Sequence, residues 1–304
     1  MTATGARPYE LVRRCDNCDG THLAVYGAAL DDPDIVHPLQ VLCRTCGLVF
    51  ATPRLSAEAL ADVYRRYALW SPSMIDAGEE EQRRVRARAL LEEIRRIVPT
   101  GRLLDVGSGT GSILVEARSA GYDVAGIEPA AHGVAFARDR YGLESLQEGT
   151  LESVALGDES YDIVVAWHVI EHVFDLDAFV ANLRRALVPG GLLVIGTESY
   201  AHPANTVVRA VRHLSGRVPR IATDSLHTFV FSPRSLRDCL ERRGFETRTL
   251  HAYDERTFAV ALRAVHARRP LRRIAALVAV GAAELAARAS RRGPYLRGFW
   301  IRTR

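Results

Sequence analysis

A glycine-rich turn is the first part of the sequence whose residue types could do chemistry. The apolar segment Leu103–Val106 contains one acid, Asp105, and runs directly into the glycine-rich segment Gly107–Gly111. From Ser112 onward the apolar spacing predicts a helix. Small residues let a backbone approach a ligand closely, and the first N–H groups of a helix have no partner within it. The pattern therefore predicts a strand, a tight turn and a helix that cradle a nucleoside-like ligand.

A carboxylate at the end of a second strand would complete such a cradle. Glu128 lies 17 residues after Gly111 and ends the apolar segment Val124–Ile127. In doubly wound folds an acid at this place accepts hydrogen bonds from ribose hydroxyls, so we expect Glu128 to hold a ribose. A plain turn that binds a dinucleotide is the alternative, but the G-x-G-x-x-G spacing and a second nucleotide-binding half are missing.

Four cysteines near the N-terminus form two C-x2-C pairs. Cys15 and Cys18 make the first pair, and Cys43 and Cys46 follow after 24 residues. Pairs at this distance are typical of a zinc ribbon, in which four thiolates complete a tetrahedron around Zn²⁺. A module this small buries little apolar surface, so we expect structural zinc to supply much of its folding free energy. Disulfides are the poorer interpretation in a reducing cytoplasm.

The elements around these residues predict an α/β fold, a Rossmann-like doubly wound sheet with its ligand at the carboxyl ends of the strands. We expect strands at Arg102–Val106, Asp123–Glu128, Ser145–Gln147, Tyr161–Trp167 and Gly191–Thr197. We expect helices at Ser112–Ala120, Gly133–Tyr141, Leu176–Leu187 and Pro233–Arg243. Two further strands, Glu246–Tyr253 and Arg256–Arg263, should form an antiparallel hairpin at the edge of the sheet.

The flanking segments divide the chain into four predicted parts. Residues 1–54 form the zinc ribbon, and residues 55–99 form a helical linker or lid built from two helices, Ser56–Tyr67 and Glu79–Val98. The α/β domain spans residues 100–265, with an insertion on its acceptor side at about 199–228. Residues 266–304 are predicted to form a basic C-terminal helix and tail.

Two further motifs make the α/β part resemble the class I S-adenosylmethionine-dependent methyltransferases. Asp162 opens an apolar strand that is followed by Ile170–Val173, with the letters IEHV. Pro189–Gly191 then introduces the next strand. These motifs, the glycine turn and Glu128 have the order and spacing of that family over about residues 101–263. The resemblance implies a methyl transfer that uses S-adenosylmethionine.

The N-terminal part is similar to a bacterial subgroup of that family. Members of the subgroup carry a four-cysteine zinc ribbon ahead of the methyltransferase domain and act on sugars, antibiotics or other small metabolites. The segments Cys46–Phe50 and His227–Ser232 carry the similarity beyond the cysteines. The similarity implies that the ribbon braces the catalytic domain or helps to wall the acceptor pocket.

The resemblance also implies a role for each part of the cradle. The glycines would line the methionine and ribose portions of the cofactor, Asp105 would orient its ammonium group, and Glu128 would bind both ribose hydroxyls. Pro129, Thr150 and Leu151 would lie near the adenine, where Thr150 replaces the acid of many relatives. Trp167 and His168 would border the methionine. The expected cofactor residues are Asp105, Gly107, Ser108, Gly109, Gly111, Glu128, Pro129, Thr150, Leu151, Trp167 and His168.

Two histidines, His172 and His227, are the expected catalytic residues. His172 follows the fourth strand, and His227 enters the segment on the acceptor side. An imidazole with a pKa of ~6.5 can take a proton from a hydroxyl or ammonium acceptor near neutral pH. A capping or supporting role is the alternative for either residue. Glu171, Glu198, Tyr200 and His202 are further candidates on the same side.

The charge distribution bears on the identity of the acceptor. From Arg263 to the end the chain has 11 arginines and one acid, whereas the first 262 residues carry 29 arginines and 35 acids. Between Cys15 and Cys46 five aspartates stand against one arginine, which is the wrong sign for binding phosphates. We therefore expect methyl transfer to a hydroxyl or amine of a small molecule, such as a sugar or natural-product intermediate. The alternatives are sugar C-methylation and, supported by the basic tail alone, rRNA or tRNA methylation.

Apolar segments long enough to cross a membrane are absent from the sequence. The best candidate, Ile274–Ala283, has ten residues, and a spanning helix needs ~20. The first ten residues are polar and do not resemble a secretory leader. We therefore expect a cytoplasmic protein without a membrane span, whose oligomeric state the sequence does not indicate.

Overall fold

The computed structural model describes residues 9–28, 39–66, 77–201, 203, 226–253 and 293–304. In this part of the chain seven strands form one mixed sheet in the order β12-β13-β10-β9-β6-β7-β8. The strands from β10 to β8 are parallel, which confirms the doubly wound fold. Their bounds are β6 Arg102–Val106, β7 Asp123–Glu128, β8 Leu146–Glu148, β9 Tyr161–Trp167 and β10 Leu187–Glu198.

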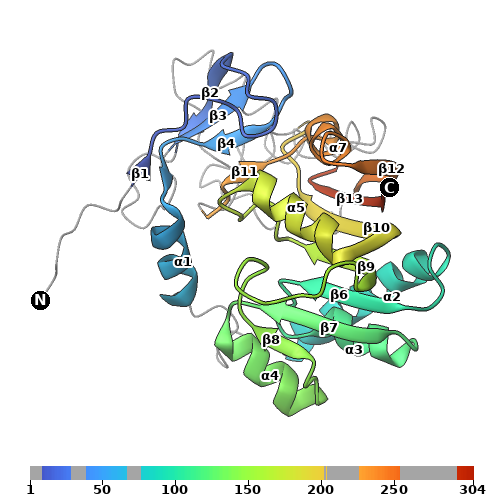
Figure 1. Ribbon diagram of the computed structural model, residues 1–304. Coiled ribbons are helices and arrows are strands. Elements are labelled where there is room, and N and C mark those ends of the chain that lie inside the picture. Colours follow the sequence, from blue (N-terminus) through green and yellow to red (C-terminus); the bar gives the residue numbers. More distant parts are fainter. Residues whose placement is uncertain (1–8, 29–38, 67–76, 202, 204–225, 254–292) are drawn as a thin grey trace, which may run out of the picture.

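Helices cover both faces of this sheet, as Figure 1 shows. One face packs on α2 (Ala77–Arg95), α3 (Ser112–Ser119) and α4 (Ala131–Tyr141), and the other on α5 (Leu176–Ala186) and α7 (Pro233–Glu241). Neighbouring residues of a strand point to opposite faces, so Leu103 and Leu104 belong to different cores. Because both faces are covered, the central strands are apolar along their whole length.

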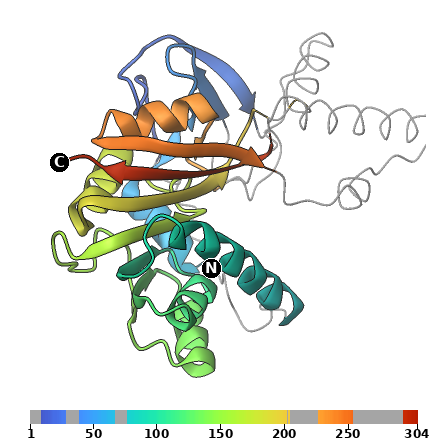
Figure 2. The ribbon, with the colours of Figure 1, turned by 90° about the vertical axis from the view of Figure 1, so that its right-hand side faces the viewer.

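The antiparallel edge of the sheet differs from the prediction. β12 (Phe245–Tyr253) pairs antiparallel with β13 (Tyr295–Arg302), which also pairs antiparallel with β10 (Figure 2). The end of the predicted basic tail is therefore a strand between two others, and it takes the place expected for Arg256–Arg263. The latter segment lies outside the described residues, as does the predicted helix over residues 269–292.

The reason for this difference is the composition of β13. Leu296, Phe299 and Trp300 are buried in the two cores, and the arginines of β13 lie at its margins with partners of their own. The Arg302 guanidinium lies 2.8 Å from a carboxylate oxygen of Glu159, and that of Arg297 lies 2.9 Å from Glu93. The arginines that made the segment read as a solvated tail are therefore paired at the sheet.

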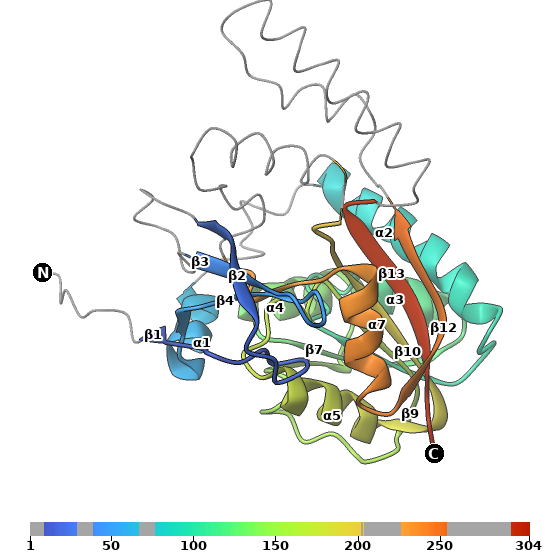
Figure 3. The ribbon, with the colours of Figure 1, turned by 90° about the horizontal axis from the view of Figure 1, so that it is seen from above.

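The N-terminal cysteines lie on a second sheet, of order β11-β4-β3-β2. Its strands are β2 (Leu23–Ala28), β3 (Leu39–Cys43), β4 (Val49–Ala51) and β11 (Phe229–Val230). β11 comes from the α/β part of the chain, with Phe229 opposite Phe50 and Val230 opposite Val49. Figure 3 shows these N-terminal strands beside α7, against which the cysteines pack in one continuous core.

Two short elements lead from this sheet into the rest of the chain. β5 (Arg54–Leu55) pairs antiparallel with β1 (Tyr9–Glu10), and α1 (Ala57–Arg66) follows it. The residues between α1 and α2, and most of the expected insertion at 199–228, lie outside the described residues. No described helix has the length and apolarity that crossing a membrane requires.

The place of β13 makes a stability prediction. Trp300 is fully buried between β12 and β10, so Trp300→Ala should lower the free energy of unfolding by about 3–5 kcal/mol, from the lost burial and the cavity left behind. Denaturant titration measures this value. Leu11→Ala, at a side chain that is 60% exposed, serves as the control. A loss below about 1 kcal/mol at Trp300 would be the behaviour of a loose tail and would contradict the sheet order.

Candidate functional site

The glycine turn lies at the carboxyl end of β6 and adopts a backbone that side chains rarely tolerate. Gly107 has φ +72°, and a Cβ there would lie 2.5 Å from a methyl group of Val169. Gly111 has φ +79°, and a Cβ there would lie 2.6 Å from Leu143. Glycine is required at both positions by backbone conformation and by close approach. The contact with Val169 also places the turn directly against the segment that follows β9.

Behind the turn, Glu80 of α2 holds the start of α3. This buried carboxylate accepts hydrogen bonds from the hydroxyls of Thr110 (2.8 Å), Ser112 (2.9 Å) and Tyr141 (2.9 Å). The linker helix therefore supports the cradle. No pattern in the sequence distinguishes Glu80 from the other acids of its helix, and its role was not predicted.

Glu128 ends β7 beside the turn, as expected of a ribose-binding acid. It is 5% exposed and accepts hydrogen bonds from the backbone N–H groups of Gly109 (2.7 Å) and Ala130 (2.8 Å). Burial raises the pKa of this carboxyl, and the two N–H donors oppose the rise. A carboxylate has about four acceptor positions, so both oxygens can still accept from a diol.

Asp105 is a buried acid with no hydrogen-bond donor for its side chain among the described residues. It is 1% exposed, and neither carboxylate oxygen has a partner there. Burial, followed by the charge of Glu128, raises the pKa of Asp105 to about 8. A buried polar group without a partner is costly, so this carboxyl is suited to a ligand that brings a cation or a donor.

The remaining predicted cofactor residues lie around the same strand ends. Pro129 follows Glu128, and Thr150 and Leu151 follow Gly149, whose N–H donates to the backbone oxygen of Glu128. Thr150 is exposed, with its N–H bonded to the Ser153 hydroxyl at 2.8 Å, and Leu151 is buried. The structure therefore places all three beside the acid, and their contact with an adenine stays a prediction.

A second cluster forms at the carboxyl end of β9, around Glu171. This side chain is 1% exposed, and its two oxygens meet the ring of His168 (3.0 Å) and the hydroxyl of Thr197 (2.8 Å). Burial disfavours its charge, but the hydrogen bond with His168 and the neighbouring imidazoles of His172 and His227 outweigh burial and hold the pKa of Glu171 at about 2. Glu171 is therefore a buried anion among three imidazoles.

The structure brings the two predicted catalytic histidines together. The ring centroids of His172 and His227 lie 4.6 Å apart with a 70° interplanar angle, and His227 is 4% exposed. His227 Nδ1 lies 3.6 Å from a carboxylate oxygen of Glu198. Donor atoms of Glu171, His172 and His227 all lie within 4.8 Å of one another, so this group could hold a metal ion.

Trp167 and His168 meet the same cluster from β9. His168 has φ +56°, its N–H donates to the oxygen of Gly196 (2.9 Å), and its ring centroid lies 5.7 Å from that of Tyr295. The Trp167 ring lies over Gly196, where a Cβ would come within 2.5 Å of it. His168 is thus held by Glu171, and a role for either residue beside a methionine stays a prediction.

Comparison with known proteins identifies the family. A family model described as a methyltransferase domain matches residues 79–250, more than half of the chain. The chain belongs to this family. The methyltransferase domain so defined contains the glycine turn, Glu128 and the Glu171 cluster, and S-adenosylmethionine fits its cradle: Asp105 offers an unmatched buried carboxylate to an ammonium group, and Glu128 offers acceptors to a ribose.

Curated relatives match part of this methyltransferase domain. A mitochondrial ubiquinone biosynthesis O-methyltransferase from Mus musculus is 32% identical over 162 residues, which cover 49% of this chain and 42% of the relative. The ubiquinone biosynthesis O-methyltransferase from Cereibacter sphaeroides is 36% identical over 100 residues, 32% of this chain and 40% of the relative. The chain thus spans less than half the length of these two relatives.

Solved structures share the fold. The complex of the Haloferax volcanii Trm112 methyltransferase activator with a methyltransferase matches with a TM-score of 0.53 at 14% identity, over 75% of this chain and 95% of that one. A SAM-dependent methyltransferase from Archaeoglobus fulgidus matches with a TM-score of 0.51 at 17% identity, over 72% and 94% of the two chains. At such identities the likeness shows the fold alone.

Beside the methyltransferase domain, the four N-terminal cysteines converge on one point. Their sulfurs all lie within 4.8 Å of one another, with Cys15 3.5 Å from Cys46 and Cys18 3.6 Å from Cys43, and none of the four is in a disulfide. Four thiolates about 2.3 Å from a tetrahedral Zn²⁺ are separated by about 3.8 Å, so the donor set and its spacing fit this ion.

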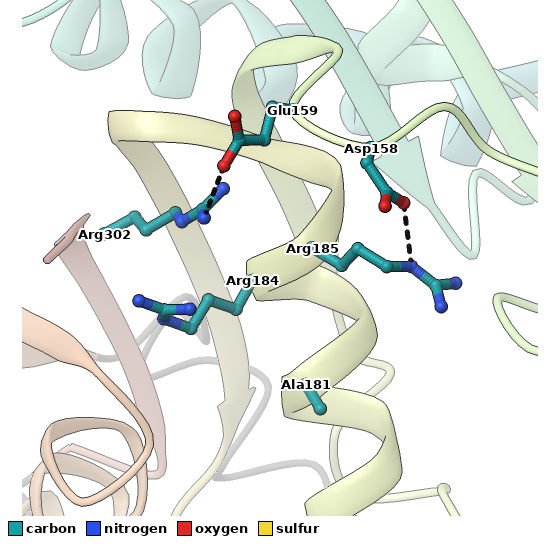
Figure 4. A pocket seen from close by; sticks show the side chains of 6 residues that line it. All are labelled: Asp158, Glu159, Ala181, Arg184, Arg185 and Arg302. Atoms are coloured by element: carbon teal, nitrogen blue, oxygen red, sulfur yellow. Dashed lines mark hydrogen bonds and ion pairs between the residues drawn. The ribbon is translucent and has the colours of Figure 1, made fainter. Parts of the chain in front are cut away.

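A surface hollow of about 430 Å³ lies away from these sites, at the amino ends of β9 and β10 (Figure 4). Its charged side chains pair with one another: Arg185 lies 3.2 Å from Asp158, and Arg302 lies 2.8 Å from Glu159. Ligands of doubly wound folds bind at the opposite, carboxyl ends of the strands. We therefore place the cofactor at Asp105 and Glu128 and not in this hollow.

Glu128 makes the first prediction for this site. Replacing it with alanine should weaken S-adenosylmethionine binding by about 30- to 1000-fold, because two hydrogen bonds to a charged acceptor contribute roughly 1.5–3 kcal/mol each. Calorimetric titration of the folded variant gives the affinity. Glu148→Ala, on the neighbouring strand β8 and exposed, is the matched control. An unchanged affinity in the Glu128 variant would refute the ribose assignment.

Asp105 makes a pH prediction. With its pKa raised to about 8, the carboxyl of the free protein is mostly protonated at pH 6–7, and a bound ammonium group lowers that pKa. Cofactor binding should then release a proton, and affinity should rise by up to about tenfold per pH unit between pH 6 and 7. Calorimetry in buffers of different ionisation enthalpy measures the release. Asp105→Asn should abolish both effects, and equal release by this variant would exclude Asp105 as the source.

Proposed function

We propose that this chain transfers a methyl group from S-adenosylmethionine to a hydroxyl group of a small molecule. The observation that carries the proposal is the contact between Gly107 and Val169. Through it, the cofactor cradle of β6 and β7 adjoins the histidine cluster of β9. One edge of the sheet therefore holds both the groups suited to the cofactor and the groups suited to an acceptor.

Each part of the site has a task in this reaction. S-adenosylmethionine supplies, when bound, a methyl group already activated by the sulfonium charge. Asp105 and Glu128 bind and orient it, which matters because alignment alone lowers the barrier of an in-line displacement. His172 and His227 are the groups that deal with the proton of the acceptor hydroxyl.

A hydroxyl is preferred over an amine because the curated relatives are named O-methyltransferases. We further propose that the hydroxyl belongs to a sugar or another small metabolite, on the resemblance of the N-terminal segment to the ribbon-bearing subgroup. The same resemblance, and the convergence of the four sulfurs, supports a structural zinc ion at Cys15, Cys18, Cys43 and Cys46.

The test is methyl transfer by the purified chain. Isotope-labelled S-adenosylmethionine is offered with a panel of sugar, hydroxylated aromatic and amine acceptors, and we expect label in an O-methyl product. His227→Ala and His172→Ala should each lower kcat by about 100-fold or more while the cofactor affinity stays unchanged. His251→Ala, at an exposed position on β12, is the control. Near-wild-type turnover in both histidine variants would refute the catalytic assignment.

A further inference from the structure

The cluster of Glu171, His172 and His227 has the composition of a metal centre. Its donor atoms, one from each residue, lie within 4.8 Å of one another. Two imidazoles and one carboxylate form a donor set that binds Zn²⁺, Fe²⁺ or other first-row divalent ions and leaves further coordination positions open. The cysteine site differs in this respect, because four protein ligands close a tetrahedron.

The groups around this cluster are those that orient metal ligands. Ligating carboxylates are themselves hydrogen-bonded, and Glu171 is held by the Thr197 hydroxyl and the His168 ring. A ligating histidine turns its second nitrogen toward a carboxylate or carbonyl, and His227 Nδ1 lies 3.6 Å from Glu198. Such an arrangement leaves the other nitrogen of His227 for an ion.

The backbone fixes the distance between the two histidines. The N–H groups of Thr228 and Phe229 both donate to the backbone oxygen of Glu171, at 2.8 and 3.0 Å. His227 is therefore tied to the residue that precedes His172, although 55 positions separate the two histidines. Ligands from two distant segments are in this way prepared before any ion arrives.

We propose that Glu171, His172 and His227 bind a divalent cation that in turn binds the acceptor hydroxyl. The inference rests on the proposed function and assigns its site a cation in place of a histidine base. A cation of this kind lowers the pKa of a bound water from 15.7 to about 7, and a bound hydroxyl is acidified by the same charge. The hydroxyl proton then leaves to solvent and not to an imidazole.

The bonding changes of the transfer balance as follows. The acceptor O–H bond breaks and its proton enters water. An oxygen lone pair forms the O–CH₃ bond, while the bond between methyl carbon and sulfur breaks and leaves its electron pair on sulfur. The positive sulfonium thus becomes a neutral thioether, one proton is released, and no oxidant or reductant is consumed.

Metal binding is tested on the full chain after zinc has been supplied to the cysteine site. Mn²⁺, which has little preference for thiolates, is titrated and its bound fraction is followed by electron paramagnetic resonance. We expect one Mn²⁺ per chain in addition to one zinc by elemental analysis. His172→Gln and His227→Gln should weaken Mn²⁺ binding more than tenfold and leave the zinc in place, and His251→Gln should change neither.

Two results would overturn the cation site. One is a wild-type chain that binds no Mn²⁺, Co²⁺ or second Zn²⁺ equivalent; the other is Mn²⁺ binding that both histidine variants retain. Calorimetric binding of S-adenosylmethionine is measured on the same samples. A chain that binds the cofactor and no second metal refutes this inference alone, whereas a chain that binds metal and no cofactor refutes the proposed function.

Discussion

The buried carboxylate of Glu171 is the interaction on which the functional edge of this protein depends. A charge removed from water is tolerated only where partners surround it, and here those partners come from β9, from β10 and from the segment before β11. Its side chain fixes His168 and Thr197, and its backbone oxygen fixes the chain next to His227. One residue therefore sets the positions of groups that are far apart in the sequence.

The N-terminal sheet extends this dependence to the cysteine cluster. β11 forms the edge of that sheet, so the segment with His227 is bound to Glu171 on one side and to β4 on the other. The Gln40 side chain donates to the backbone oxygen of His227 at 3.4 Å, and the Tyr200 hydroxyl donates to the oxygen of Gly47, next to Cys46. The ribbon is therefore part of the framework around the histidines, which agrees with its acidic charge and the lack of a phosphate-binding surface in its sequence.

Local patterns predicted the cofactor half of the site well. β6, β7 and β9 have the predicted bounds, because continuous apolar strands between glycine turns allow few alternatives. The acceptor half depends on contacts that no local pattern encodes. The two-residue strand β11 exists only through its pairing with β4, and the strand β13 was hidden by arginines that find acids on other elements. His172 and His227 were each predicted from position, but their contact follows from the backbone oxygen of Glu171.

A crystal structure with S-adenosylhomocysteine tests the central claim most directly, namely that one edge of the sheet holds cofactor and acceptor groups together. The account predicts the ribose hydroxyls at Glu128, the ammonium group at Asp105 and the sulfur facing His172 and His227. A ligand bound away from Glu128, or one whose sulfur points away from the two histidines, would contradict it.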